Sequence, residues 1–280
     1  MVENKIRTFN KTLKDIKNHK IQGARNIAKA AIKAYFLIPT ETSKKKLFSS
    51  RPTEPMLQNV VNLLSKNVTK ENYNKILNHF DSAQNKINNY VFKIIKNNDV
   101  IFTHCHSTNV VNALIYAKKK GKNFEVYNTE TRPLYQGRKT ARELRKAGIK
   151  VTMFIDSALE VALLKEQGTK KVNKVFLGAD ALLKKGIINK IGSRVIAQIA
   201  EKNKIPVYII ADSWKYSIKP IKIEQRSLKE IWKKAPKNIR IKNPSFEFVP
   251  KKYIKAIISE LGILSYEKFL KKISNRKIKI

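Results

Sequence analysis

The chain has 280 residues, of which 42% are hydrophobic and 9% aromatic, so it can bury a substantial core and is not a wholly disordered polycation. Its 59 Lys and Arg residues against 21 Asp and Glu give a formal net charge of +38, which fits either a polyanionic partner or an ordinary fold with a lysine-rich surface. A single cysteine excludes both an intrachain disulfide and a multi-cysteine zinc site.

Targeting and nucleic-acid signals are missing from the sequence. No apolar segment approaches the roughly 20 residues that a membrane-spanning helix needs, and the first residues, MVENKIRTFNK, lack the apolar core of a signal peptide. We therefore expect a cytoplasmic protein with no membrane partner, in which a free thiol is stable. Lysine is spread through nearly every expected helix, without a helix-turn-helix, an aromatic RNA-binding box or a zinc knuckle, so we do not expect a nucleic-acid partner.

Residues 1–97 are predicted to form a helical N-terminal domain. Apolar residues recur at helical spacing within residues 21–32, 56–64 and 76–94. The stretch 41–55 breaks this spacing and is predicted to be a loop. No strand-like alternation precedes residue 98.

Residues 98–280 are predicted to form a Rossmann-like, doubly wound parallel-sheet domain with a C-terminal helical tail. Short runs rich in Val, Ile and Phe predict strands, and helical stretches separate them, as is typical of a parallel sheet covered on both faces. The predicted strands are 99–104, 124–128, 150–156, 174–180 and 207–212, and the predicted helices are 107–119, 138–147, 157–167, 190–203 and 251–273. The fold class is therefore α/β, and the lack of a G-x-G-x-x-G motif argues against a dinucleotide.

The ends of the predicted strands carry the polar residues that can do chemistry, because parallel sheets bind ligands beyond the carboxyl ends of their strands. Cys105 follows a strand and precedes a helix, whose N-terminus would lower the thiol pKa, as would protonated His104 and His106. The alternative is a buried, inert cysteine. Asp180 ends another strand, where burial would raise its pKa and make it a general acid; the alternative is a helix cap.

Other polar positions are weaker on their own. His104 and His106 would share a face of a strand, but a lone pair of histidines is poor evidence for a metal site. Candidates for binding phosphate are scattered along the chain, and each alone is more typical of a solvated charge. They are Gly23-Ala24-Arg25 near the start of a helix, Arg51 at the end of a loop, Asn189-Lys190 at the opening of a helix, and Lys215 after the last strand.

A string of motifs, in one order, resembles the superfamily of translation-initiation-factor-2B-like sugar-phosphate isomerases. The motifs are IQGARNIAKAA (21–31), SSRPT (49–53), THCHS (103–107), ETRPLYQGRKTARELRKAGI (130–149), FIDSA (154–158), GAD (178–180), INKIGS (188–193), ADSWKY (211–216) and RIKNPSFEFVPKKYIKAIISELG (240–262). The HCHS form, together with IQGA, is most similar to the archaeal ribose 1,5-bisphosphate isomerases, which make ribulose 1,5-bisphosphate in nucleotide (AMP) salvage.

The resemblance implies roles for individual residues. Cys105 would be the base that takes the C2 proton, and Asp180 the acid that protonates oxygen. The substrate would be a small anionic sugar bisphosphate, with no cofactor or metal, and the protein a homo-oligomer, from dimer to hexamer. The residues implied in binding substrate and phosphate are Gln22, Gly23, Ala24, Arg25, Arg51, Ser107, Asn189, Lys190 and Lys215.

Two other branches of the superfamily remain as alternatives. The regulatory subunits of the initiation factor share the fold but generally lack the pair that Cys105 and Asp180 form here. Methylthioribose 1-phosphate isomerases keep the pair, but they usually show a TGAL-like stretch after the cysteine, where this chain has HSTNV. Gln22 and Arg25 depart from the usual residue types of the family at those places.

Overall fold

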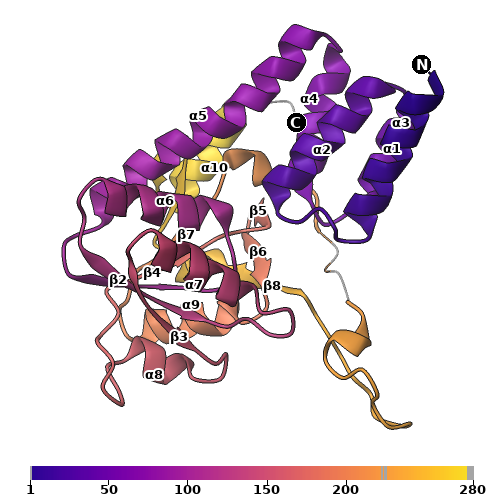
Figure 1. The fold of residues 1–280 in the computed structure, drawn as a ribbon. Helices are drawn as coiled ribbons and strands as arrows, with labels where there is room; N and C mark the ends of the chain where they lie inside the picture. Colours follow the sequence, from indigo (N-terminus) through magenta and orange to yellow (C-terminus); the bar gives the residue numbers. More distant parts are fainter. Residues whose placement is uncertain (1, 222, 224–225, 276–280) are drawn as a thin grey trace.

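Five helices precede the first strand in the computed structural model, which describes residues 2–221, 223 and 226–275 (Figure 1). They bury one continuous apolar core, to which Trp214 from the other half of the chain also contributes. The helices are α1 (Val2–Lys17), α2 (Ala24–Leu37), α3 (Glu41–Ser50), α4 (Pro55–Lys66) and α5 (Lys70–Ile94).

Helix α3 occupies most of the stretch that the sequence analysis predicted to be a loop, so that prediction was wrong. The Thr40 side chain accepts a hydrogen bond from the Ser43 backbone N–H and caps the helix, and Leu47 is fully buried. With few apolar residues between charged ones, the helix has too little periodicity to be recognised without its tertiary contacts.

A seven-stranded sheet follows, in the order β10-β9-β7-β4-β1-β2-β3. All neighbouring pairs are parallel except β9 with β10. The strands are β1 (Asp99–Thr103), β2 (Phe124–Thr129), β3 (Lys150–Phe154), β4 (Lys174–Leu177), β7 (Val207–Ile210), β9 (Ala256–Ser259) and β10 (Gly262–Leu264). Strands β1, β2, β3, β4 and β7 begin at the first residues of the five predicted strands and end within three residues of the predicted ends. Since β2 and β3 lie on one side of β1 and β4 on the other, the order of strands reverses between β1 and β4.

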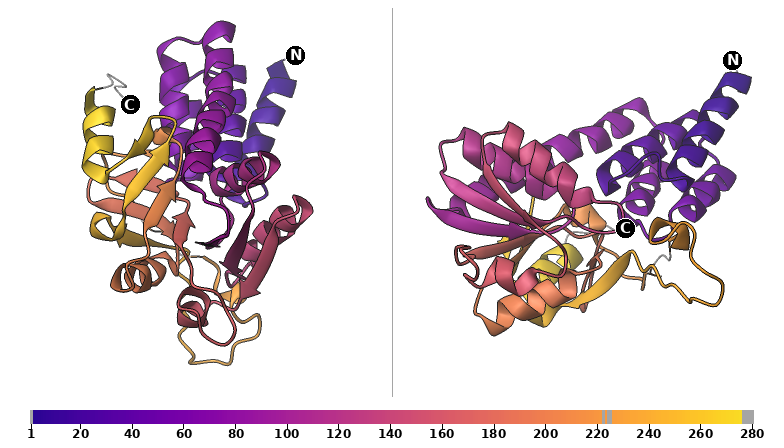
Figure 2. Two further views of the ribbon diagram at one scale, coloured as in Figure 1. Left: turned by 90° about the vertical axis from the view of Figure 1, so that its left-hand side faces the viewer. Right: turned by 60° about the horizontal axis from the view of Figure 1, so that its bottom comes forward.

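Helices cover both faces of this sheet, as expected for a doubly wound fold (Figure 2). Alternate residues of β1 point to opposite faces: Ile101 packs with one core and Phe102 with the other. On one face lie α6 (Thr108–Lys119), α7 (Gln136–Lys146) and the C-terminal half of α5. On the other lie α8 (Leu159–Leu163), α9 (Ser193–Lys202) and α10 (Tyr266–Asn275).

A second, three-stranded sheet was not predicted. It consists of β5 (Ala181–Leu183), β6 (Gly186–Lys190) and β8 (Phe246–Pro250), paired antiparallel in the order β5-β6-β8. Three short 3-10 turns complete the described elements: η1 (Ser213–Lys215), η2 (Leu228–Glu230) and η3 (Lys251–Tyr253). The predicted final helix over 251–273 was also wrong, since η3, β9 and β10 occupy its first part and only α10 is an α-helix.

None of the helices in the described part of the chain has the length and apolar character needed to cross a membrane.

Gly137 allows the start of α7 to pack directly on the end of β2. A Cβ atom at this position would lie 1.7 Å from the Thr129 carbonyl oxygen, so the backbone would have to move. We expect Gly137→Ala to lower the free energy of unfolding by about 3 kcal/mol or more. Chemical denaturation would measure this, with the exposed Arg142→Ala on the same helix as a control expected to stay within about 0.5 kcal/mol. Equal stabilities of the two variants would contradict this account.

Candidate active site

The ends of β1 and β4 meet where the strand order reverses, which is where open parallel sheets bind ligands. The loop after β1 carries Cys105, and the loop after β4 carries Asp180. Ser107 crosses so close to Gly178 that a Cβ atom on Gly178 would lie 2.7 Å from the serine side chain. The glycine thus brings the two loops into contact.

Cys105 lies in a fixed but unusual backbone conformation. Its φ of 64° is in the left-handed region, which costs free energy for a residue with a side chain. Two threonines stabilise it: the Cys105 N–H donates to Thr131 Oγ1 at 3.0 Å, and Thr140 Oγ1 donates to the Cys105 carbonyl at 2.8 Å. The conformation turns the chain between strand and helix and leaves the cysteine lining a cavity.

Burial raises the pKa of the Cys105 thiol to about 11, so the expected lowering was wrong. Lys190 opposes this rise, and the negative charge of Asp180 adds to it. Helix α6 begins only at Thr108, three residues after the cysteine, so its N-terminus does not overcome burial.

The two neighbouring histidines are neutral and do not supply the expected positive charge. Burial lowers the pKa of His104 to about 4, and burial also lowers the pKa of His106. The ring of His104 bonds to Thr129 Oγ1 at 2.6 Å and to the Ile191 carbonyl at 2.8 Å. His104 therefore serves to hold the strand ends together, and the two histidines do not form a pair on one strand.

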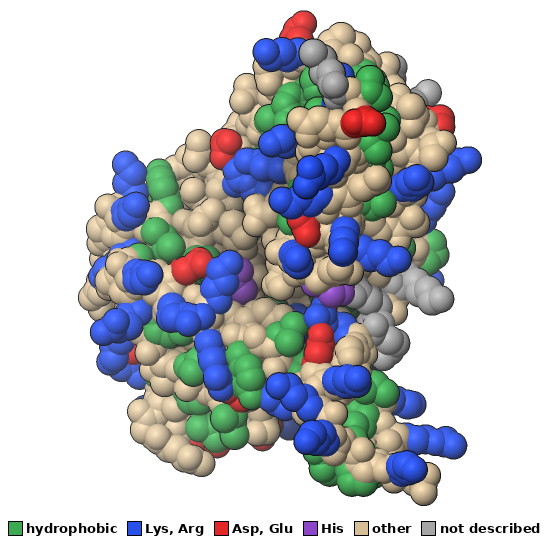
Figure 3. Space-filling view, turned by 45° about the vertical axis from the view of Figure 1, so that its right-hand side comes forward, with side chains coloured by type: hydrophobic (Ala, Val, Ile, Leu, Met, Phe, Trp, Pro, Cys, Tyr) green, Lys and Arg blue, Asp and Glu red, His purple; other side chains and the backbone are tan. Residues whose placement is uncertain are grey.

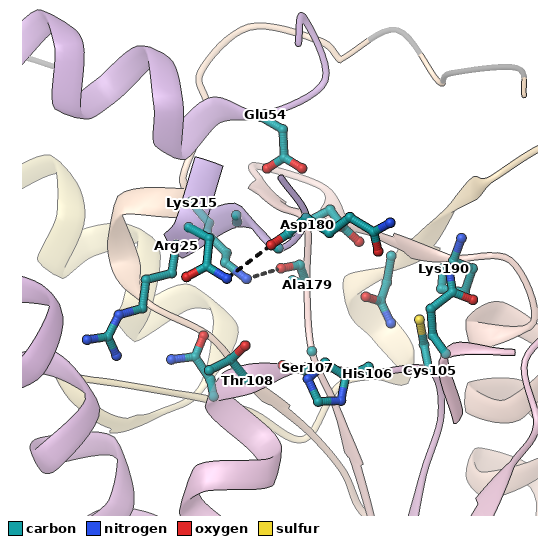
Figure 4. A pocket seen from close by; sticks show the side chains of 18 of the residues that line it. Arg25, Glu54, Cys105, His106, Ser107, Thr108, Ala179, Asp180, Lys190 and Lys215 are labelled. Atoms are coloured by element: carbon teal, nitrogen blue, oxygen red, sulfur yellow. Dashed lines mark hydrogen bonds between the residues drawn. The ribbon is translucent and has the colours of Figure 1, made fainter. Parts of the chain in front are cut away.

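Asp180 lies beside a lysine that follows β7, the parallel neighbour of β4 in the sheet. Its N–H donates to the Ile188 carbonyl at 2.8 Å, which begins the pairing of β5 with β6. Lys215, on η1, donates from Nζ to the Ala179 carbonyl at 2.6 Å, and Figure 4 shows this contact next to Asp180. Lys215 is buried, so its charge acts on the cavity with little screening by water.

Asn189 and Lys190 do not open a helix, as predicted, but end strand β6. The hydrogen bonds of Asn189 Nδ2 to Ser193 Oγ, at 2.8 Å, and of Ser193 Oγ to the Lys190 carbonyl, at 2.6 Å, fix the turn into α9. The Lys190 ammonium lies 5.0 Å from the centre of the Phe246 ring. Asn189 and Lys190 are both buried. Lys190 therefore reaches the cavity from the second sheet and not, as predicted, from the start of a helix.

The N-terminal helices close the other side of the same cavity. Gly23, with a φ of 84°, precedes the first turn of α2, which has no side-chain cap, so its backbone N–H groups are available to an anion. Arg25 pairs with Asp81, and Arg51 lies 3.7 Å from Glu54. Basic side chains elsewhere are spread over the surface, without a single patch on the face shown in Figure 3.

The structure brings every candidate residue from the sequence to this one cavity. Those lining it are Gln22, Gly23, Ala24, Arg25, Arg51, Cys105, Ser107, Asp180, Asn189, Lys190 and Lys215. Further residues with polar side chains also line it and were not singled out, among them His19, Glu54, Gln136 and Arg226. Gln136 Oε1 is buried without a hydrogen-bond partner among the described residues, as an acceptor for a ligand would be. Gln136 lies inside a recognised motif and Glu54 directly follows another, SSRPT (49–53), whereas Arg226 lies in an irregular segment that carried no signal.

A cluster of His79, Asp212 and Glu260 borders the site, with possible metal-ligand atoms within 4.8 Å of one another. Each is already hydrogen-bonded: His79 Nε2 lies 3.2 Å from Asp212, and Glu260 accepts from the Ser213 N–H at 3.0 Å. Burial, and next the charge of Asp212, raise the pKa of Glu260. These hydrogen bonds anchor the turn η1.

Comparison with known proteins finds relatives along nearly the whole chain. The model of the Initiation factor 2 subunit family matches residues 20–266. The chain is 36% identical to the ribose 1,5-bisphosphate isomerase of Methanocaldococcus jannaschii, over 90% of each chain. It is similar to the structure of translation initiation factor eIF-2B from Pyrococcus horikoshii, with a TM-score of 0.80 and 26% identity over 92% of this chain and 96% of that one. The structure of 5-methylthioribose 1-phosphate isomerase from the same organism shares the fold, with a TM-score of 0.78 and 23% identity over 95% and 87%.

The raised pKa of Cys105 predicts the pH dependence of its reactivity. A thiol with a pKa of about 11 is protonated at neutral pH, so alkylation by iodoacetamide should be slow at pH 7 and should rise towards pH 11. Because Lys190 lowers this pKa, Lys190→Ala should move the profile to higher pH. Mass spectrometry of the single cysteine measures the rate, with the exposed Lys170→Ala as a control that should leave it unchanged. A rate that reaches half of its maximum near pH 8.5, roughly the pKa of a free cysteine, would contradict the raised pKa of Cys105.

Proposed function

Because the chain belongs to the Initiation factor 2 subunit family, we propose that it is an isomerase that converts ribose 1,5-bisphosphate to ribulose 1,5-bisphosphate. The relatives that support the reaction are the archaeal isomerases of that name, which are 31–36% identical over about 90% of the chain. The observation that carries the mechanism is that a thiol and a carboxyl, Cys105 and Asp180, line one cavity together with buried cations.

The substrate explains why both groups are needed. Its C1 oxygen carries a phosphate, so the sugar ring does not open as a free aldose does, and the ring oxygen must be protonated by an acid. A proton must then leave C2. In this proposal Asp180 protonates the ring oxygen and Cys105 removes the C2 proton, so the carboxyl must start protonated and the thiol ionised. The enol so formed becomes the ketose when Cys105 returns its proton to C1 and Asp180 takes the proton of the C2 hydroxyl, which restores both groups.

The resting thiol sets a condition on this mechanism. At a pKa of about 11, only about one thiol in ten thousand is ionised at pH 7. Transfer of its proton to the Asp180 carboxylate produces a thiolate and a carboxylic acid without changing the net charge of the site. We therefore propose that this transferred form of the pair is the one that reacts, and that Lys190 stabilises its thiolate.

The positive groups suit a substrate with two phosphates. Each phosphate monoester carries about two negative charges, so the substrate needs cations at both ends. Lys190 and Lys215 come from the sheet, whereas Arg25, Arg51 and the first turn of α2 come from the N-terminal helices. Backbone N–H groups at the start of α2 and Ser107 would complete the contacts.

The remaining proposals concern the protein as a whole. We propose that residues 1–97 and 98–280 are its two domains, that it acts in the cytoplasm, and that it needs no cofactor or metal.

We also propose that it assembles into a homo-oligomer, from dimer to hexamer. Several large apolar side chains are exposed, and burial by another copy would remove them from water; they are Met153, Ile155, Ile218 and Trp232. Light scattering of the purified protein should give at least twice the chain mass of 32.2 kDa, and a monomer would contradict the assembly.

The reaction is tested by assaying ribose 1,5-bisphosphate and methylthioribose 1-phosphate side by side. We expect turnover of the bisphosphate, and a loss of at least about 1000-fold in kcat for Cys105→Ser and for Asp180→Asn, because each removes a proton-transfer group. Unchanged thermal unfolding of both variants would show that they fold. Exposed Lys170→Ala is a control that should keep full activity.

A regulatory role is the second candidate, favoured by the 26% identity and TM-score of 0.80 with the initiation factor structure. It predicts a folded wild-type protein that turns over neither substrate. A tight complex with a GTPase that both Cys105→Ser and Asp180→Asn leave intact would support it. Turnover of methylthioribose 1-phosphate alone would instead contradict the proposed substrate, but the protein would still be an isomerase.

A further inference from the structure

The long connection between η1 and β8 carries an arginine to the cavity. We call this connection, residues 217–245, the strap, of which 222, 224 and 225 lie outside the described residues. Figure 1 shows the strap in orange, projecting from the sheet on the side where helices α1 to α3 lie. Most of it is exposed, yet Arg226 lines the cavity beside residues of the N-terminal helices.

Arg226 is held in a defined position by its own segment. Its Nε and Nη2 donate to the Glu230 carboxylate at 2.9 Å and 2.6 Å, and its backbone N–H donates to the Asn243 carbonyl at 3.1 Å. Asn243 Nδ2 in turn donates to the Ser227 carbonyl and to Glu230. The side chains of Arg226 and Glu230 are only 15% and 18% exposed. An otherwise irregular segment is thus locked where it meets the cavity.

The strap meets the cavity at the end formed by the N-terminal helices. Glu230 lies close enough to His19 for the histidine to contribute to the lowering of the Glu230 pKa, although Arg226 is the main cause. His19 in turn contacts the Arg51 guanidinium. Arg226 therefore joins Arg51 and Arg25 in a group of guanidinium side chains that comes from three separate segments of the chain.

We propose that Arg226 is a specificity-determining residue that binds one of the two phosphates of the substrate and so favours a bisphosphate over a monophosphate. This inference rests on the proposed function. A guanidinium has five N–H donors in one plane, so a carboxylate on one edge and a phosphate on another can be bound at once. Glu230 is a positioning residue, because it holds the guanidinium on the strap at the rim of the cavity.

The test compares Arg226→Ala with wild type in turnover of ribose 1,5-bisphosphate and in calorimetric binding of ribulose 1,5-bisphosphate, ribulose 1-phosphate and ribulose 5-phosphate. We expect KM and the bisphosphate Kd to rise about 10- to 100-fold, with kcat within about threefold. One of the two monophosphates should lose affinity, and the other should stay within about twofold. A change in which both monophosphates weaken equally would overturn the assignment to one phosphate.

Matched variants separate binding from folding. Exposed Arg240→Ala removes the same charge from the same strap and should leave every constant within about twofold. Arg226→Lys should recover part of the affinity, because a lysine keeps the charge without the planar fork. If Arg226→Ala does not fold, the double variant Arg226→Ala with Glu230→Gln, which leaves no unpaired carboxylate, is measured instead.

The outcomes distinguish this inference from the proposed function. Wild-type turnover with an Arg226→Ala KM and Kd within twofold of wild type overturns the role of Arg226 alone. A folded wild-type protein that neither binds ribulose 1,5-bisphosphate nor turns over ribose 1,5-bisphosphate overturns the proposed function, and the role of Arg226 with it.

Discussion

The cavity depends on the turn η1, where the helical half of the chain and the sheet are joined. Asp212 accepts hydrogen bonds from the Trp214 N–H, at 2.8 Å, and from His79 on α5, at 3.2 Å. The rings of His79 and Trp214 stack with centroids 3.4 Å apart, so the same turn is anchored in the core of the helices. Because Lys215 ends this turn, these contacts also hold its ammonium on the Ala179 carbonyl beside Asp180. A change in the packing of α5 would therefore reach the Asp180 carboxyl through one short turn.

The positions of Cys105 and Asp180 could be predicted because they follow from local sequence and one topological rule. Five strands were recognisable as apolar runs, and the carboxyl ends of parallel strands share one edge of a sheet. Cys105 and Asp180 follow β1 and β4, which are adjacent at the reversal of strand order, so their proximity needs no long-range knowledge. The phosphate-binding candidates reached one cavity as well, but it was the resemblance to a family that grouped them, since each alone was ambiguous.

The parts that could not be predicted depend on tertiary contacts. The strand β6 is stabilised by β5 and β8, which lies about sixty residues later in the chain, so the sequence around Lys190 resembles the start of α9 instead. The pKa of Cys105 depends on how deeply the cysteine is buried, which neither its neighbours nor the following helix reveal. The position of Arg226 could not be predicted for the same reason, because it depends on hydrogen bonds to Glu230 and Asn243 within an irregular segment.

The net charge of +38 says less about binding than the placement of a few cations. Most lysines are solvated, and at physiological ionic strength a charge more than about 8 Å away is largely screened. Their shared field can speed the approach of an anion at low salt, but it does not distinguish one phosphate from two. The guanidinium groups of Arg25, Arg51 and Arg226 lie at the cavity, each with a carboxylate nearby. Such paired charges add little to the net field, yet they hold donors in fixed directions, as the proposed discrimination between one phosphate and two requires.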